Sequence, residues 1–405
     1  MILRCRLSFL ISSKTSGKQM VVYHSELTVL RFSNGTVATC PLIPKKQATI
    51  CFKVLFARVT FVVASSGYIN SSLCNRLRLL QFYKINISII PIHRSYFSSE
   101  GLEYNMIRVP IGGADFSTHP YTYNEHPWHD AALSNYTLAD EDYFYKVRSV
   151  PSTKDSIKIT ASTWSPPVWM KTNERITGFA QLRPEYYQAY ADYHLKFIEE
   201  YSKAEVPIWA ITTTNEPING VVPFVDFNSL GWFPSDLVTN NLGPTIRNSR
   251  FNNTLILAID DQRYLLHIYL NGMQRGDPKS IEYIDGIAIH YYGNFAPPVD
   301  GAFLARQTDL NNFVVGWIDW NLCLDENGGP NWADNFVDAP ILVYGDKDEF
   351  IKQPMFYAMG HFSKFIPRGS KRIQVNQRSL FSIDNVAFIT PAGNIVMVLH
   401  NRYVT

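Results

Sequence analysis

The stretch PIWAITTTNEP, from Pro207 to Pro217, decides the fold of this chain. Its apolar and β-branched residues form an uninterrupted run, which is typical of a strand buried in a parallel sheet. Pro217 has no backbone N–H to donate, so the strand ends before it. Asn215 and Glu216 therefore follow the carboxyl end of a buried strand, where barrels and open α/β sheets carry their chemistry.

Two interpretations of Asn215 and Glu216 stay open at this point. A carboxyl group beside an apolar strand end has a raised pKa when it loses solvent, and it can then serve as a general acid. In the other interpretation, the two side chains merely cap the next element. The local pattern alone favours capping, because acidic side chains at a protein surface are common.

Further strand-like runs recur along the chain from about Ser95. They are Glu103–Pro110, Ser156–Thr163, Pro207–Thr214, Thr254–Asp261, Ile284–Tyr292 and Phe313–Trp320. Amphipathic segments lie between several of them, and the clearest, Arg183–Ala204, places Pro184 in the first turn of a predicted helix. Strands that alternate with helices predict an α/β fold with a parallel sheet. After Phe350 the pattern changes, and Asn385–Asn401 predicts a hairpin of a separate β module.

Composition narrows the class of protein. The formal charge of +2 argues against a nucleic-acid-binding protein. Aromatic residues make up 14% of the chain, which suits a sugar-binding cleft and equally suits ordinary packing. The first 13 residues, MILRCRLSFLISS, mix basic residues into a short apolar run and make a poor signal peptide. The five cysteines show no metal-ligand spacing and indicate no compartment.

Polar and aromatic residues follow nearly every predicted strand. In chain order they are Arg108, Asp115, Trp164, Trp169, Asn215, Glu216, Asp260, Asp261, His290, Tyr292, Asp319, Trp320 and Asn321. Carboxylates, amides and tryptophans gathered at one rim of a parallel barrel are typical of a site that cleaves sugars. A metal site at His290, Asp260 and Asp261 is the competing idea. No ligand spacing supports it, and a hydrogen-bonded histidine at the rim fits better.

Six longer motifs resemble the glucosylceramidases of glycoside hydrolase family 30. They are YFSSEGLEYNMIRVPIGGADFS, ASTWSPPVWMKTN, WAITTTNEP, LDENGGPNW, NFVDAPI and KQPMFYAMGHFSKFIPRGS, and the similarity runs from about Tyr96 to Arg402. The resemblance implies a (β/α)8 TIM-type barrel beside an immunoglobulin-like β-sandwich module. It divides the chain into an unaligned segment 1–94, a barrel domain 95–340 and a partial β module 341–405.

The resemblance also implies an activity and a setting. Family members hydrolyse glucosylceramide to glucose and ceramide, retain the anomeric configuration and use no metal or organic cofactor. The expected partners are a glycosphingolipid at a membrane surface and an activator of the saposin type, with no nucleic acid. The expected location is the lysosome.

Particular positions of this chain match the family's site residues. Glu216 matches the general acid/base, and Asn215 would bind the sugar 2-hydroxyl. The remaining matches would bind the sugar or line the rim: Asp115 and Asn335 as hydroxyl contacts, Trp164 and Trp320 as apolar faces, Arg108 as an orienting cation, and Tyr292 as a rim residue. For each of these the alternative is packing in the core or the rim.

The chain departs from the family at the nucleophile. A retaining glycosidase needs a second carboxylate roughly 5–5.5 Å from the first. The family's nucleophile is a glutamate in a Ser-Glu-Ala-Cys segment at the end of the seventh strand, and this chain has no such segment. The only glutamates after Glu216 are Glu282, which precedes its strand, Glu326, which lies in a loop past the last strand, and Glu349, which leads into the β module, and none is placed to attack an anomeric carbon. Asp319, at the end of a strand, is the one nearby acid that could substitute for the nucleophile, and it is expected to brace the rim instead.

The spacing of the strands shows the same gap. A crossover helix, a strand and a second helix cannot fit between Tyr292 and Phe313, because one crossover alone takes ~10–12 residues. The seventh strand is therefore expected to be absent. Two hypotheses follow: a glucosylceramidase-like glycosidase with impaired activity, or a non-catalytic relative or incomplete gene product that retains glucoside binding.

Overall fold

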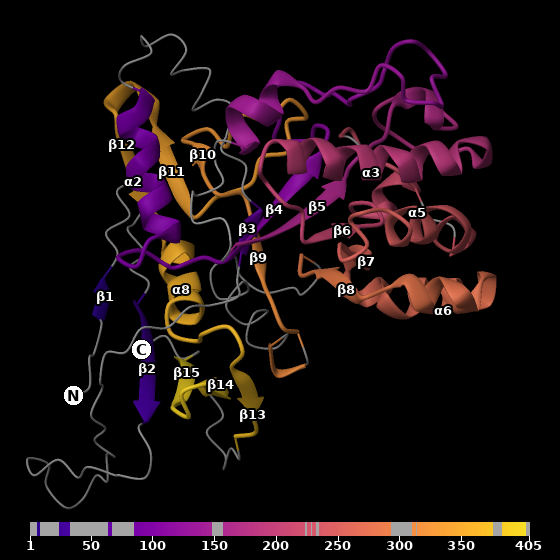
Figure 1. Cartoon of the computed structure of the whole chain (residues 1–405). Coiled ribbons are helices and arrows are strands. Elements are labelled where there is room, and N and C mark those ends of the chain that lie inside the picture. Colours follow the sequence, from indigo (N-terminus) through magenta and orange to yellow (C-terminus); the bar gives the residue numbers. More distant parts are fainter. Residues whose placement is uncertain are drawn as a thin grey trace, which may run out of the picture.

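A seven-stranded parallel sheet forms the centre of the molecule (Figure 1). The computed structural model describes residues 6–8, 24–32, 64–66, 85–147, 157–222, 225–227, 229–231, 235–292, 310–312, 314–375 and 383–401. The strand order is β8 (Gly286–His290), β7 (Leu255–Gln262), β6 (Ala210–Thr212), β5 (Lys158–Thr163), β4 (Met106–Ile111), β3 (Ala64–Ser66) and β9 (Ile318–Trp320). Every neighbouring pair is parallel.

Six of these strands confirm the runs predicted from the sequence. The buried pattern explains why: all six residues of β4 and the last five of β5 are buried, as expected for strands covered on both faces. β9 is shorter than its predicted run, because residues 314–317 form a loop in which Val315 is 88% exposed. Phe313, the predicted start of that run, lies outside the described residues.

The N-terminal segment contributes strands that the sequence pattern did not predict. β3 pairs with β4 on one side and β9 on the other, within the parallel sheet. β1 (Arg6–Ser8) and β2 (His24–Phe32) belong to a second, antiparallel sheet of five strands in the order β1-β2-β15-β14-β13. β1, β2 and β3 thus place parts of the N-terminal segment in both sheets.

The antiparallel sheet contains the predicted C-terminal hairpin. β14 (Ile383–Ile389) and β15 (Ile395–Asn401) pair antiparallel from Ile383 with Asn401 to Ile389 with Ile395, and the turn between them contains Pro391. β13 (Lys371–Ile373) extends the sheet on the far side of β14. Three short strands, β10 (Leu324–Asp325), β11 (Ile341–Tyr344) and β12 (Glu349–Lys352), form a third sheet.

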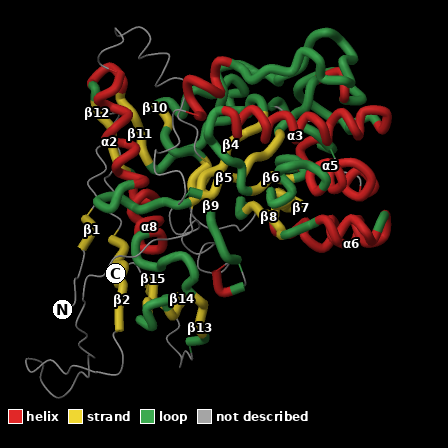
Figure 2. The backbone as a smooth tube through the Cα atoms, viewed as in Figure 1, coloured by secondary structure: helices red, strands yellow, loops and turns green. Residues whose placement is uncertain are grey.

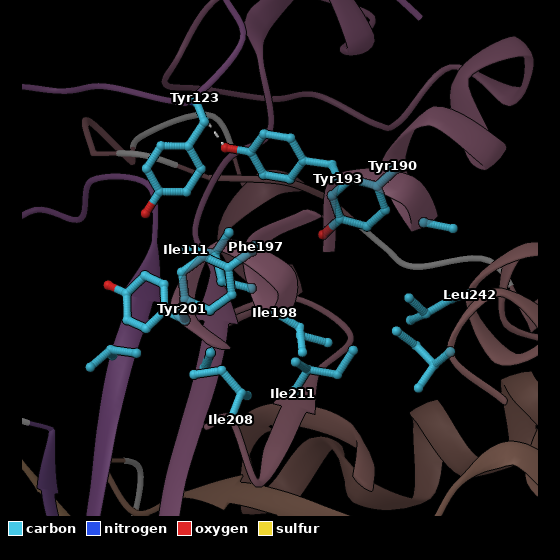
Figure 3. Packing of buried hydrophobic residues seen from close by; sticks show 14 of the residues in the cluster. Ile111, Tyr123, Tyr190, Tyr193, Phe197, Ile198, Tyr201, Ile208, Ile211 and Leu242 are labelled. Atoms are coloured by element: carbon cyan, nitrogen blue, oxygen red, sulfur yellow. Dashed lines mark hydrogen bonds between the residues drawn. The ribbon is translucent and has the colours of Figure 1, made fainter. Parts of the chain in front are cut away.

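Helices cover the parallel sheet along one side, as Figure 2 shows for α3 (Tyr187–Lys203), α5 (Gly243–Arg247) and α6 (Leu266–Gly276). α3 confirms the helix predicted over Arg183–Ala204, and a 3₁₀ turn with Pro184 at its start precedes it. Its inner face packs on the sheet through Tyr190, Tyr193, Phe197, Ile198 and Tyr201 (Figure 3). These side chains are 0–1% exposed, so burial of apolar area holds the helix against the sheet.

A second core joins the parallel sheet to the antiparallel one. α2 (Ile85–Phe97) and α8 (Pro354–Ser363) meet there, and Tyr96, Phe356 and Phe362 are 0–3% exposed. Val386 and Val398 of the β14–β15 hairpin belong to the same cluster. The hydroxyl of Tyr96 donates to the carbonyl of Leu322 (2.6 Å), which ties α2 to the loop that follows β9.

Short elements complete the described chain, and several of them shape the loops that follow the strands. These are the π-helical turns η1 (Asp142–Lys146) and η7 (Val238–Leu242), the 3₁₀ turns η4 (Val168–Met170), η5 (Pro184–Tyr186), η6 (Pro217–Gly220), η8 (Arg263–Leu265), η9 (Pro278–Tyr283) and η10 (Gly345–Lys347), and the short helix α4 (Ser235–Leu237). Within the described ranges, no helix has both the length and the apolar character needed to cross a membrane.

The parallel sheet has two edges, β8 and β9, where a closed barrel would have none. In the described part of the chain β8 pairs only with β7, and β9 pairs only with β3. The edge at β8 exposes apolar surface, since Ile287 is 46% exposed. The seam between these edges falls at the place where the sequence lacks room for a seventh strand.

Candidate active site

A bulge in β7 sets the geometry of the site. The register of β7 against β8 shifts between Ile259 and Asp261, so Asp260 is the extra residue. Both Ile259 (φ 78°) and Asp260 (φ 48°) adopt left-handed backbone conformations, which are strained for non-glycine residues. The side chains of Asp260 and Asp261 consequently have different partners. Asp260 meets residues of β4, β5, β6 and β8, whereas Asp261 accepts the backbone N–H of Ile218 (2.8 Å) in η6.

Asp260 is the hub of a buried polar network. Its Oδ2 accepts hydrogen bonds from the Arg108 guanidinium (2.5 Å), the Ser162 hydroxyl (2.7 Å) and the Thr212 hydroxyl (2.8 Å). Its Oδ1 lies 2.9 Å from Nε2 of His290. Burial alone would raise the pKa of this carboxyl, but Arg108 and His290 hold the pKa below its usual range. Asp260 is therefore an ion at neutral and acidic pH.

Glu216 lies beside this hub, on the loop that follows β6. Its backbone is left-handed (φ 40°, ψ 64°), and its N–H donates to the carbonyl of Asp260 (2.9 Å). The carboxylate contacts three side chains: Nδ1 of His290 is 2.7 Å from Oε1, the Gln262 amide donates to Oε1 (3.0 Å), and the Asn219 amide donates to Oε2 (2.6 Å). The side chain is 14% exposed, so the carboxylate retains some access to solvent.

Asn215 and Arg108 connect Glu216 to an aromatic wall. The side-chain oxygen Oδ1 of Asn215 accepts a hydrogen bond from Arg108 (2.7 Å). The Arg108 guanidinium lies 4.6 Å from the centre of the Trp164 ring. Trp164 stacks on Trp320, with ring centres 5.3 Å apart and planes inclined by 26°. The two tryptophans come from the ends of β5 and β9, which are far apart in the sequence.

Asp115 and Asn335 form a second polar pair at the ends of the strands. The Asn335 amide donates to Oδ2 of Asp115 (2.7 Å), and the Trp332 indole donates to the neighbouring carbonyl of Ala114 (2.8 Å). Asp115 is 4% exposed. Burial, aided by the charge of Glu216 and opposed by the bond from Asn335, raises the pKa of Asp115 to about 7. Asp115 is thus able to donate as well as accept a hydrogen bond in weakly acidic solution.

The structure places six of the eight predicted site residues at or after the carboxyl ends of strands, with Arg108 inside β4 and Asn335 in the loop between β10 and β11, and it does not join all eight in one contact network. Arg108, Asn215 and Glu216 belong to the Asp260 network, Trp164 lies under Arg108, and Trp320 stacks on Trp164. Asp115 and Asn335 pair with each other. Tyr292 lies at the outer edge, 50% exposed, with its ring against Tyr291 and His290.

Sequence reasoning missed the contacts that join Glu216 and Asp260 to their neighbours. Glu216 binds His290, Gln262 and Asn219, and Asp260 joins strands β4 to β8. The signal for His290 and Asp260 was their place at strand ends. Nothing in the pair Asp260-Asp261 showed which carboxylate faces inward, because the bulge decides it. Among the described residues, no group of three or more His, Cys, Asp and Glu is arranged to hold a metal ion.

The later acidic residues lie away from Glu216 or have other partners. Glu282, Glu326 and Glu349 are exposed and belong to η9, the loop after β10 and β12. Asp319 is 3% exposed, and its carboxylate accepts a hydrogen bond from the Trp317 indole (2.8 Å). Asp319 therefore braces the chain where β9 begins.

Comparison with known domains and proteins identifies the family. The Glycosyl hydrolase family 30 TIM-barrel domain matches residues 86–301 and 302–366, and the family 30 beta sandwich domain matches residues 369–405. The interruption at residues 301 and 302 falls between β8 and β9, at the seam of the sheet. The matched barrel begins with α2, so β1, β2 and β3 precede both matched domains.

Similar proteins agree with this assignment. Lysosomal acid glucosylceramidase of Mus musculus is 37% identical over 360 residues, covering 76% of this chain and 69% of that protein. Putative glucosylceramidase 3 of Caenorhabditis elegans is 37% identical over 356 residues, covering 76% and 68%. These alignments are longer than 76% of a 405-residue chain, so each relative carries positions that this chain lacks.

A solved structure supports the fold independently. The crystal structure of SrfJ from Salmonella typhimurium superposes with a TM-score of 0.73 at 22% identity, covering 86% of this chain and 84% of that one. The endo-beta1,6-glucanase BT3312 follows with a TM-score of 0.68 at 24% identity, covering 85% and 84%. The sequence matches, the two domain assignments and the arrangement around Glu216 agree: this chain is a glycosidase-type protein that belongs to glycosyl hydrolase family 30.

Proposed function

We propose that the site at the carboxyl ends of the strands binds the glucosyl group of glucosylceramide, with Glu216 facing the glycosidic oxygen. The observation that carries this proposal is the position of the Glu216 carboxylate, which is held by three side chains beside Asn215 and keeps 14% exposure. The stacked Trp164 and Trp320 offer apolar faces for a sugar ring, and Asp115 with Asn335 offers hydrogen bonds to its hydroxyls. Two relatives carry the name glucosylceramidase.

The chemistry that we propose for this chain is limited because no second carboxylate is placed to act as the nucleophile among the described residues. Retaining hydrolysis needs a nucleophile roughly 5–5.5 Å from the acid/base. Asp260 is occupied by four partners, Asp319 is bonded to Trp317, and the three later glutamates are exposed on other elements. Glu216 can protonate a leaving oxygen, which is typically worth ~10²–10⁴-fold. We therefore propose slow hydrolysis at most.

The lack of a placed second carboxylate also favours a second candidate function, in which the chain binds glucosides without hydrolysing them.

The setting of this function is also a proposal. Glucosylceramide carries its sugar on a membrane lipid, so the loops around the site would meet a membrane surface. Phe336 is 66% exposed and directly follows Asn335, and Tyr292 is 50% exposed at the outer edge, so both offer apolar area there. An activator of the saposin type would lift the lipid toward the site. The lysosome is the proposed location, in keeping with the name of the mouse relative. The charge of +2 gives no support for a nucleic-acid partner.

Binding and turnover of glucosylceramide test the proposal separately. The probe is glucosylceramide with a fluorescent acyl chain in mixed micelles, with the galactosyl lipid as the competitor. We expect specific binding of the glucosyl lipid that Asp115→Ala and Asn335→Ala weaken at least about tenfold, the loss of roughly one good hydrogen bond to a ligand. Glu282→Gln, which changes an exposed residue in η9, serves as the matched control and should bind normally. Equal affinity for both lipids would refute the proposed specificity.

A further inference from the structure

His290 lies between two carboxylates, and this position constrains its protons. Its Nδ1 is 2.7 Å from Oε1 of Glu216, and its Nε2 is 2.9 Å from Oδ1 of Asp260. The ring is largely enclosed, with 14% of the side chain exposed. Both of its nitrogens therefore face oxygen atoms at hydrogen-bond distance.

Counting donors leaves two arrangements for the protons. A neutral imidazole has one N–H, and an ionised carboxylate only accepts. Asp260 is an ion because Arg108, Ser162 and Thr212 all donate to it, so Nε2 of His290 carries the proton that bonds Asp260. One more proton then lies between Nδ1 of His290 and Oε1 of Glu216. It makes either an imidazolium beside a carboxylate or a neutral imidazole beside a carboxylic acid.

The other partners of Glu216 select the first arrangement in the unliganded site. The side-chain amides of Gln262 and Asn219 donate to Oε1 and Oε2, and hydrogen bonds from such donors stabilise the ionised carboxylate. The other charged or titratable groups around His290 are Asp260 with its partner Arg108, Asp115 near Glu216, and the phenol of Tyr292. Burial alone would lower the pKa of His290, but Glu216 and Asp260 raise it to about 9.

We propose that His290 stores the proton that Glu216 delivers to a glycosidic oxygen, so that the unliganded site holds Glu216 as a carboxylate. This inference rests on the proposed function of Glu216 as acid/base. In the transfer, the Nδ1–H bond of His290 breaks and an O–H bond forms at Oε1 of Glu216. An ion pair becomes a neutral pair, and their summed charge does not change. A sugar that displaces water from the site favours this step, because desolvation disfavours the charged forms.

His290 is thus a positioning residue for the proton of Glu216. The chain of contacts from Arg108 through Asp260 to His290 fixes the tautomer of the ring, since Nε2 must donate to Asp260. The β7 bulge places Asp260 in that chain, so the strained backbone at Ile259 and Asp260 helps to orient the ring that bonds Glu216 on the loop after β6.

Nitrogen-15 NMR of the unliganded protein tests the proposal directly. With ¹⁵N-labelled histidine, long-range correlation spectra distinguish a doubly protonated ring from either neutral tautomer, and His290→Gln assigns the signal. We expect His290 to be doubly protonated from about pH 5 to pH 8. His194 is the internal reference, because it is fully buried, faces only the carbonyl of Tyr190 and the hydroxyl of Thr163, and has its pKa lowered by burial to about 4. A neutral His290 ring at about pH 6.5 would overturn the proposal.

Two variants separate a stored proton from a structural histidine. Glu216→Gln keeps the size of the side chain and removes its charge, and it should move the titration of His290 down by at least about one pH unit, which is a tenfold loss of proton affinity. Glu282→Gln removes an exposed charge in η9 and should leave the titration in place. The same titration in wild type and Glu216→Gln would refute the proposal. Because the spectra need no substrate, a protein that fails to bind glucosylceramide yet keeps a doubly protonated His290 would refute the proposed function alone.

Discussion

Burial and neighbouring charges set the pKa values of the carboxyl groups at the strand ends. Arg108 is 7% exposed and Asp260 is 3% exposed, and their contact of 2.5 Å is the centre of the network around Glu216. Asp115 has different surroundings: it accepts a hydrogen bond from the neutral side-chain amide of Asn335, and burial raises its pKa to about 7. The strand ends thus carry one carboxyl group that stays ionised, Asp260, and one that is partly protonated near pH 7, Asp115. Acid–base sites use such a difference in pKa between two carboxyl groups.

Replacing Arg108 by methionine should strongly destabilise the chain. The substitution leaves the charge of Asp260 buried with only hydroxyls and His290 to stabilise it, and breaking one side of a buried ion pair typically costs about 3–5 kcal/mol. Urea unfolding measures the loss. Arg94→Met is the matched control, because the Arg94–Glu100 pair is 64% and 76% exposed and surface pairs contribute little. Similar midpoints for the two variants would contradict the role assigned to Arg108.

Asp115→Asn should change how stability depends on pH. The folded pKa of about 7 lies above the unfolded value of 3.8, so the contribution of Asp115 to stability is full below pH 3.8 and is lost as pH rises toward 7. The asparagine variant lacks this loss. Relative to wild type it should therefore gain about 2 kcal/mol between about pH 5 and pH 7.5. Urea midpoints at the two pH values measure it, and parallel pH profiles would show that Asp115 titrates normally.

Among the strands, the bulge in β7 and the edge position of β8 determine features that an alternating or apolar sequence pattern does not predict. β7 is one residue out of register with β8 at the bulge, and this turns Asp260 toward β4, β5 and β6 while Asp261 bonds η6. β8 ends the sheet among the described strands, and its apolar Ile287 is 46% exposed. An exposed apolar edge strand is a site for association between chains.

Ile287→Lys should reduce self-association of the chain. A lysine on an edge strand opposes pairing with another copy through charge and solvation. Light scattering over a concentration series measures the effect, and we expect a shift toward monomer with an unchanged far-ultraviolet spectrum. Ile281→Lys alters the same residue type at 44% exposure in η9, away from the strand edge, and should leave association as in wild type. Equal effects of both substitutions would mean that total charge, rather than the edge, controls association.

The whole molecule combines Glu216, our proposed acid/base, with a parallel sheet that is open between β8 and β9 in the described residues. The family match breaks at residues 301 and 302, between the two edges of the sheet, and the relatives carry positions that this chain lacks. The resemblance places the family's nucleophile at the end of the seventh strand, so we expect this chain to lack the carboxylate that forms the covalent intermediate.

The chain should form no covalent adduct with a mechanism-based glucoside inactivator. Such reagents trap the glycosyl–enzyme intermediate, and the described carboxylates around Glu216 are engaged elsewhere: Asp260 accepts from Arg108, Asp261 from Ile218, Asp319 from Trp317 and Asp115 from Asn335. Intact-mass spectrometry after exposure provides the measurement. A family member that has the Ser-Glu-Ala-Cys segment is the positive control and should be labelled. A stoichiometric glucosyl adduct on this chain would reveal a nucleophile and restore full glycosidase chemistry.

The sequence by itself determined the fold class, most of the strands and the position of Glu216. These features depend on local patterns: apolar runs that must be buried, a proline that ends a strand, and a helical period in Arg183–Ala204. The same patterns predict that the seventh strand is absent, because chain length between two strands is a property of the sequence; this stays a prediction, since residues 293–309 lie outside the described part of the chain. The β module was predicted from its hairpin alone, and that hairpin forms as expected.

Only the tertiary structure decided how the polar residues are joined. The bond between Glu216 and His290 spans 74 positions and that between Arg108 and Asp260 spans 152, so no local pattern records either pairing. The bulge that turns Asp260 inward depends on the pairing of β7 with β8, and the strands of the N-terminal segment depend on partners up to hundreds of residues away. Local sequence sets which elements form, whereas burial and long-range pairing set which side chains meet and which protons they hold.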